Sequence, residues 1–244
     1  MATTREDMVM MAKLAEQADR HDEMVDQMCK LVQLVISRGD SLNEDERNLF
    51  SVAFKNQVGA RRSAYRNIAS VEAKTTDERL KKLAFNYRMK IFKELEAKSN
   101  EIIKLLDDSF LQDPNESSAD CYVFFMKMKG DYCRYLCEPS TDVNVNRKQS
   151  ILDASKAYET ANTHASSLPA THPVKLGLAL NHSVFHYEIM ENSEKACHIA
   201  KTAFDDAMLD LETTDDDKAK DATLIMQLLR DNISLWTQDH TDDN

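Results

Sequence analysis

The stretch Arg47-Asn-Leu-Phe-Ser-Val-Ala-Phe-Lys55-Asn-Gln-Val-Gly-Ala-Arg61-Arg62-Ser-Ala-Tyr65-Arg66 has the spacing of one long helix. At 100° per residue, Arg62 and Arg66 lie within about 20° of Lys55 around that helix. Three like charges on one stripe repel each other, so the stripe indicates a partner with concentrated negative charge or a solvated face near carboxylates from elsewhere. Spacing alone favours the solvated face. Arginine forks and lysine ammonium groups also suit a phosphate.

The composition of the whole chain predicts an all-α protein. Four glycines and four prolines in 244 residues leave few places for turns, while helix-forming residues are abundant. We expect nine antiparallel helices over residues 4–20, 22–38, 44–75, 78–109, 117–138, 146–165, 172–190, 193–210 and 217–236. We expect one domain over residues 1–236 and a short, acidic, flexible tail over residues 237–244.

The charge and the cysteines narrow the class of protein. A formal charge of −11 argues against nucleic acid as the main partner, because such binding needs a broad basic surface. Five cysteines, an odd number without a Cys-x-x-Cys pair, fit reduced thiols. No apolar run is long enough to span a bilayer, so we expect no membrane insertion. These features predict a cytoplasmic protein that can also be nuclear.

A second basic group lies in the stretch Lys127-Met-Lys-Gly-Asp-Tyr-Cys-Arg134-Tyr135. Lys127 and Arg134 are seven residues apart and share a helix face. An arginine beside a tyrosine hydroxyl supplies good phosphate donors, so Arg62 and Arg134 could clamp one phosphate from two helices. Alone, this second basic group is weak evidence for a phosphate site. Together with the first basic stripe, it is stronger evidence.

Two later segments carry an asparagine next to an apolar stripe. Leu180 and Val184 step four residues apart toward Glu188, with Asn181 at the border. A similar stripe holds Leu224, Leu228 and Leu235 with Asn232 beside it. An asparagine can donate and accept at once, so it could hold an extended peptide backbone. For either helix alone, an ordinary core with a bonded asparagine is the commoner outcome.

Several blocks of the chain resemble the 14-3-3 family. The blocks are residues 47–49, 58–63, 127–132, 134–136, 171–173, 176–181, 193–204 and 223–236. They are spread along the chain, and the resemblance covers nearly all of it. The resemblance implies a concave, nine-helix protomer that dimerises into a cup with two peptide grooves. It also implies an adaptor that sequesters, masks or clamps phosphorylated clients in signalling, and neither an enzyme nor a cofactor protein.

The resemblance also assigns residues. Phosphoserine or phosphothreonine would be held by Lys55, Arg62, Arg134 and Tyr135. The client peptide would lie along Arg66, Lys127, Leu180, Asn181, Val184, Glu188, Leu224, Ile225, Leu228, Asn232, Leu235 and Trp236. A homodimer, or a heterodimer with related proteins, would form through Leu14, Ala18, Arg20, Glu23, Ala64, Ile68, Tyr87, Lys90 and Glu94. In that dimer Arg20 could pair with Glu94, and Glu23 with Lys90, across the two-fold axis.

Two pairs depart from the family's pattern. Cys133 with Cys137, and His182 with His186, are each four residues apart, so each pair shares a helix face. Two such pairs could hold zinc, although the His-Glu-x-x-His pattern is absent. Buried thiols and packed histidines are commoner, so we expect no metal. The alternatives are therefore a scaffold for unphosphorylated amphipathic or extended peptides, or a metal-binding protein, including a metal-assisted enzyme.

Overall fold

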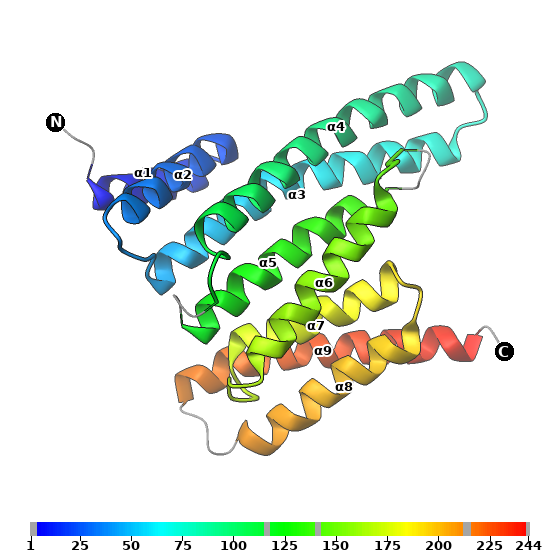
Figure 1. The fold of residues 1–244 in the computed structure, drawn as a ribbon. Coiled ribbons are helices and arrows are strands. Elements are labelled where there is room, and N and C mark those ends of the chain that lie inside the picture. Colours follow the sequence, from blue (N-terminus) through cyan, green and yellow to red (C-terminus); the bar gives the residue numbers. More distant parts are fainter. Residues whose placement is uncertain (1–3, 115–117, 140–142, 212–215, 243–244) are drawn as a thin grey trace. The chain divides into compact units, whose positions relative to one another are not determined.

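The computed structural model describes residues 4–114, 118–139, 143–211 and 216–242, and within these ranges the chain forms nine α-helices and no strand (Figure 1). The helices are α1 Arg5–Gln17, α2 His21–Ser37, α3 Glu44–Lys74, α4 Glu78–Ser109, α5 Ala119–Cys137, α6 Arg147–Ala165, α7 Pro173–Glu188, α8 Ser193–Asp210 and α9 Asp216–Asp242. The all-α prediction is confirmed. No helix among the described residues combines the length and apolar content needed to cross a bilayer.

Two predicted helix ends need correction. The first expected helix ends at Gln17 rather than at residue 20. The sequence predicts that the last helix ends at residue 236, but α9 continues to Asp242, so residues 237–242 are helical rather than part of a separate tail. Residues 243 and 244 of that expected tail lie outside the described residues, as does residue 117 of the expected fifth helix.

Local side-chain chemistry explains where two helices begin. Asn43 accepts a hydrogen bond from the Glu46 amide at 2.9 Å, and the Glu46 carboxylate accepts one from the Asn43 amide at 2.9 Å. This reciprocal pair satisfies two amide groups that the first turn of α3 leaves without helical partners. His172 caps α7 in the same position, with its ring Nδ1 accepting from the Val174 amide at 3.2 Å ahead of Pro173.

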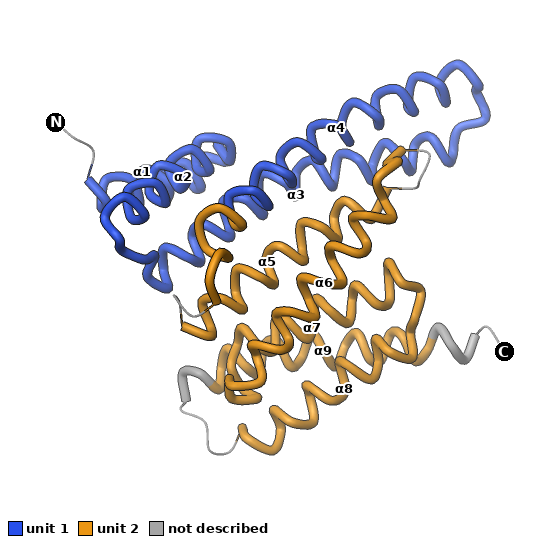
Figure 2. Tube along the Cα trace, in the orientation of Figure 1, with its two compact units in different colours: residues 1–105 blue, residues 106–244 orange. Residues whose placement is uncertain are grey.

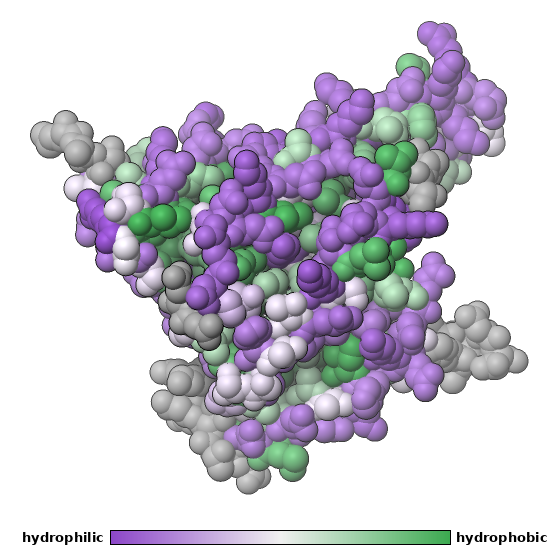
Figure 3. Space-filling model, viewed as in Figure 1, coloured by the Kyte–Doolittle hydropathy of each residue, from purple (hydrophilic) through white to green (hydrophobic). Residues whose placement is uncertain are grey.

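The chain divides into two compact units, residues 1–105 and 106–244 (Figure 2). Each has its own core, and the predicted single domain over residues 1–236 stays a prediction. In the first unit, Met24, Met28 and Leu31 of α2 are fully buried, as are Phe50 and Phe54 of α3. The rings of Phe50 and Phe54 lie 5.0 Å apart. On the face that Figure 3 shows, hydrophilic side chains predominate, as a 30% content of charged residues leads one to expect.

The second unit depends on a close approach between α5 and α6. Tyr158 of α6 is fully buried, and its ring lies against the backbone of Gly130 in α5. A Cβ atom at position 130 would stand 2.8 Å from Tyr158 Cε1. Glycine at this position therefore lets the tyrosine ring occupy the space that any larger residue would take.

We predict that Gly130→Ala destabilises the protein although alanine is the better helix former. The alanine should gain about 1 kcal/mol in helix propensity but cost about 1–3 kcal/mol in overpacking, because a buried ring cannot move aside easily. Gly59→Ala is the matched control in α3, where nothing lies within 4 Å of the added Cβ. Urea unfolding at one protein concentration should show that Gly59→Ala stabilises the chain. Equal urea midpoints for Gly130→Ala and Gly59→Ala would contradict the close approach of the Tyr158 ring to Gly130.

Candidate functional site

The first basic stripe lies on α3 in the first unit. Because α3 is continuous from Glu44 to Lys74, Lys55, Arg62 and Arg66 share a face as predicted. Lys55 and Arg66 are exposed and Arg62 is half-buried. The adjacent Arg61 has a different role, because its guanidinium donates to the carbonyl of Gln57 at 2.8 Å and lies 3.5 Å from Asp22 of α2. These contacts tie Arg61 to the helix packing of this unit.

The second basic group surrounds a buried carboxylate in the second unit. Asp131 accepts hydrogen bonds from Lys127 Nζ at 2.9 Å and from the Tyr158 hydroxyl at 2.7 Å. Asn181 of α7 donates its amide group to both carboxylate oxygens, at 2.8 and 2.9 Å. Arg134 Nη2 lies 3.8 Å from the same carboxylate, and Arg134 Nε donates to the Tyr158 hydroxyl at 3.2 Å. This Asp131 network joins α5, α6 and α7.

The Asp131 network keeps its charged groups ionised. Burial alone would raise the pKa of Asp131, but the positive charges of Lys127 and Arg134 lower it below its ordinary value. Burial likewise opposes the charged form of Arg134, yet Tyr158 and Asp131 raise its pKa above the ordinary range. Asp131 offsets one of the two positive charges of Lys127 and Arg134 inside the network, and Glu188 at its exposed edge offsets the other. A guanidinium that is held ionised at such an edge is a strong hydrogen-bond donor for an anion.

Arg134 also contacts two residues at the edge of this network. Its Cζ atom lies 4.9 Å from the centre of the Tyr135 ring, which is a cation–π contact. Its Nη1 atom lies 3.9 Å from the carboxylate of Glu188, which is exposed at the end of α7. The arginine is therefore held in place from several sides, and a ligand that meets it finds a fixed side chain.

The predicted peptide-binding residues of the second unit follow their helices. Leu180 and Val184 of α7 and Ile225 of α9 are partly buried against the core. Leu224, Leu228 and Leu235 are exposed, and Leu224 has 67% of its surface in solvent. Asn232 is half-buried. Leucines that remain exposed on one stripe form an apolar surface that a peptide could cover.

Trp236 has a supporting role in this arrangement. It is only 3% exposed, and its ring stacks on Tyr187 at 4.8 Å between centroids. Its ring therefore packs on Tyr187 and the core of the unit. It holds α9 against α7 beneath the exposed leucines.

The predicted dimer residues lie in the first unit with mixed exposure. Leu14 of α1 and Tyr87 of α4 are 50% and 54% exposed. Arg20 forms an ion pair with Glu23 in the same chain, so the predicted pairs across the two-fold axis would have to replace this contact. Ala18, Lys90 and Glu94 are exposed, while Ala64 and Ile68 are half-buried. The dimer contacts themselves stay a prediction.

The cysteine and histidine pairs are packed rather than arranged as ligands. The Cys137 thiol donates to the carbonyl of Cys133 at 3.1 Å, and burial raises the pKa of each thiol to about 12. The rings of His182 and His186 lie 4.8 Å apart. In the described part of the chain, no three His, Cys, Asp or Glu side chains gather as metal ligands, so the zinc alternative is not favoured.

Sequence reasoning missed two members of the Asp131 network. Asp131 is four residues after Lys127 and three before Arg134, so the helical period could have revealed it as their shared partner. Tyr158 lies on another helix, 27 residues away from Asp131. No local pattern marks that tyrosine, because the contact depends on how α5 and α6 pack. Arg62 belongs to the first unit and Arg134 to the second. That they hold one phosphate together stays a prediction.

Comparison with known proteins gives consistent matches. Residues 11–237 match the family model of the 14-3-3 protein. The chain is 50% identical over 236 residues to 14-3-3 protein homolog 1 of Schistosoma mansoni, covering 96% of this chain and 90% of that protein. It is 48% identical over 245 residues to Protein BMH1 of Saccharomyces cerevisiae, covering 98% and 88% of the two chains.

The buried histidine predicts how stability depends on pH. Burial, with His186 and Lys195 nearby, lowers the pKa of His182 from 6.5 to about 4. The unfolded chain therefore takes up a proton before the folded chain does, so the stability that the neutral ring contributes is present above pH 6.5 and is lost as pH falls toward 4. At pH 5, His182 should therefore lower the free energy of unfolding by about 1–2 kcal/mol relative to pH 7.

Urea unfolding at pH 7 and pH 5 measures that loss. His182→Phe should reduce the difference between the two pH values, because phenylalanine keeps the ring packing and cannot titrate. His198→Gln, a change at an exposed position of α8, is the control and should leave the difference unchanged. An unchanged difference in His182→Phe would show that other groups cause the acid sensitivity.

Proposed function

The chain belongs to the 14-3-3 family, and we propose that it holds the phosphate of a client phosphoserine or phosphothreonine with Lys55, Arg62, Arg134 and Tyr135. Family membership makes the chain a phosphopeptide-binding adaptor. The observation that carries the assignment of residues is the Asp131 network, which fixes Arg134 beside the ring of Tyr135.

The charges of the four side chains match those of a phosphate. A phosphoryl group brings a charge of about −1.5 to −2 at pH 7 and three acceptor oxygens. Lys55 and Arg62 are like charges on one face of α3, and a phosphate between them would lower their mutual repulsion. Arg134 adds a fork whose orientation is already set by its contacts, so little side-chain entropy is lost when it binds. Tyr135 adds a hydroxyl donor.

The client backbone would lie along α7 and α9. Asn181 uses its amide nitrogen on Asp131, and this contact sets the plane of the amide that would meet the client backbone. Asn232 would contact a second point of the peptide. Leu224, Leu228 and Leu235 are exposed without a client and would be covered by it. Arg66, Lys127 and Glu188 would border the phosphate.

The proposed role is to sequester, mask or clamp phosphorylated clients in the cytoplasm. Two sites in one dimer would bind a doubly phosphorylated client with avidity, because the second contact becomes intramolecular. The proposal needs no cofactor and no chemical step, so we propose that the protein is not an enzyme. Nucleic acid is not expected as a partner, since the chain carries a net charge of −11.

Charge reversal of Arg62 tests the phosphate clamp. Arg62→Glu should weaken binding of a phosphopeptide by at least about 30-fold, because it replaces an attraction to a dianion with a repulsion. Isothermal titration calorimetry gives the affinity. Lys156→Glu, the same kind of charge change at an exposed position of α6, should leave the affinity within about twofold.

The same variants separate the clamp from a scaffold that binds unphosphorylated peptides. A scaffold would bind through the exposed leucines, so Arg62→Glu would barely affect it. Equal losses in Arg62→Glu and Lys156→Glu would mean that only the overall charge matters, and the assignment of Arg62 would be wrong.

We also propose that two chains pair through the first unit. Leu14 and Tyr87 expose apolar surface that a partner would cover, together with Ala18, Ala64 and Ile68. The partner is a second copy of this chain or a related family member.

Leu14→Glu should weaken a dimer by at least about tenfold, because a charge would be taken out of water at the interface. Sedimentation equilibrium measures this change. Leu152→Glu is the matched control, since Leu152 is also exposed but lies on α6 of the other unit. If Leu152→Glu dissociates the dimer and Leu14→Glu does not, the interface does not lie at Leu14.

A further inference from the structure

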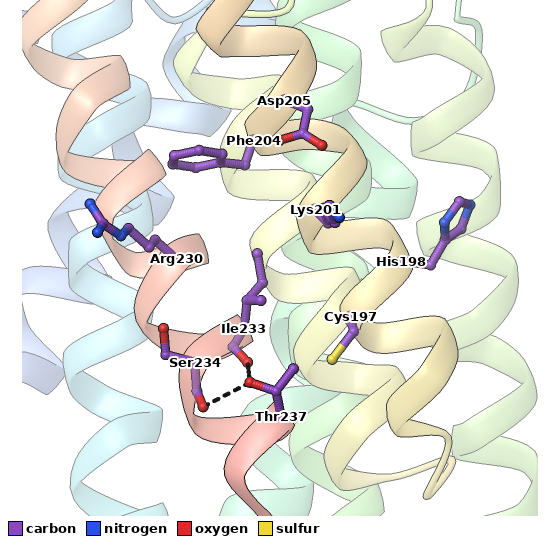
Figure 4. Close-up of a pocket in the computed structure, with 9 residues that line it drawn as sticks. All are labelled: Cys197, His198, Lys201, Phe204, Asp205, Arg230, Ile233, Ser234 and Thr237. Carbon is purple, nitrogen blue, oxygen red and sulfur yellow. Dashed lines mark hydrogen bonds between the residues drawn. The ribbon is translucent and has the colours of Figure 1, made fainter. Parts of the chain in front are cut away.

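A trough of about 560 Å³ lies between α8 and α9, within the second unit (Figure 4). We call it the α8–α9 trough. Its lining includes Cys197, Lys201 and Phe204 from α8 and Arg230, Ile233 and Ser234 from α9. The lining residues recur at intervals of three and four, so each helix presents one continuous stripe to the trough.

The trough is separate from the proposed client groove. Ile233 lies about 140–160° around α9 from Leu228 and Leu235, so these leucines face away from the trough. A ligand in the trough would therefore leave the proposed phosphate and peptide contacts uncovered. Nothing in the proposed adaptor function uses this side of α8 and α9.

The floor of the trough is apolar and firmly supported. Cys197, Phe204 and Ile233 are partly buried, and all three pack against a core that includes Ala200 and Trp236. A side chain that rests on a packed core keeps its position, so the floor exists before a ligand arrives. Its volume falls in the range of small-molecule sites, which is about 300–1,000 Å³.

The rim of the trough carries positive charge on an acidic protein. Lys201 and Arg230 come from opposite helices, and both are exposed. Within the described part of the chain, neither of them forms an ion pair with another residue. Asp205 is the single carboxylate of the lining, so its acids and bases leave a surplus of one positive charge. A local surplus of this kind favours an anion against a net charge of −11.

We propose that the α8–α9 trough binds a small amphipathic carboxylate, with its apolar body on the floor and its carboxylate toward Lys201 and Arg230. The seven helical steps from Cys197 to Phe204 span about 10 Å, which matches a chain of about eight carbons. A peptide or protein partner fits less well, because a stable protein interface buries at least about 1,000 Å² and the trough extends for only about two helical turns.

Titration calorimetry of the full chain with octanoate tests the proposal. Octanoate should bind at one saturable site, and the neutral 1-octanol should bind at least fivefold more weakly. Lys201→Glu and Arg230→Glu should each weaken octanoate binding at least fivefold. Lys156→Glu should leave it unchanged, and Asp205→Asn should strengthen it, because the only acid of the lining is removed. Octanoate binding that survives both charge reversals would overturn the proposal, as would no binding at all.

Cys197 provides a second readout that places the ligand. Octanoate should slow alkylation of Cys197 by a maleimide, measured by peptide mass spectrometry, while the half-buried Cys29 and Cys121 react at unchanged rates. Equal protection of all three thiols would indicate a general stabilisation and would contradict the site. A saturating phosphopeptide should not displace octanoate. Displacement would place the octanoate in the client groove and overturn the assignment to the trough.

Discussion

A carboxylate in the interior of the second unit is the constraint on which this structure depends most. An unpaired charge in that place would cost several kcal/mol, so the fold has to bring partners to Asp131. Lys127 and Arg134 supply charge from the same helix, and Tyr158 and Asn181 supply hydrogen bonds from α6 and α7. The pairing fixes the cation that would meet a client phosphate. It also explains Gly130, since the Tyr158 hydroxyl reaches Asp131 only if its ring can lie on the backbone of α5.

The helices α7, α8 and α9 use their faces for different purposes. The core between them is formed by small and apolar side chains such as Leu176, Ala200 and Trp236. One stripe of α9 leaves leucines exposed, and the nearly opposite stripe borders the α8–α9 trough. Because both surfaces rest on the same core, a ligand in the trough and a client on the other side could bind independently or change each other's affinity through α9.

The parts that the sequence predicts best are those set by neighbours along the chain. The expected helix over residues 44–75 agrees with α3, and 100° per residue is enough to align Lys55, Arg62 and Arg66 on one face. Contacts between helices are harder to predict from the sequence. Tyr158 carries no local sign of its bond to Asp131, and the histidine pair that suggested zinc is packed among aromatic rings. The polar composition of residues 237–242 suggested a flexible tail, but α9 continues to Asp242, because composition alone does not say where a helix stops.

The central claim is that a client is recognised through its phosphate. Fluorescence anisotropy with one Arg- and Ser-rich peptide, phosphorylated and unphosphorylated, at two salt concentrations tests this most directly. The account predicts tight binding of the phosphorylated form alone, weakening at the higher salt concentration because charges on both sides are screened. Equal affinity for both forms, with no effect of salt, would contradict it.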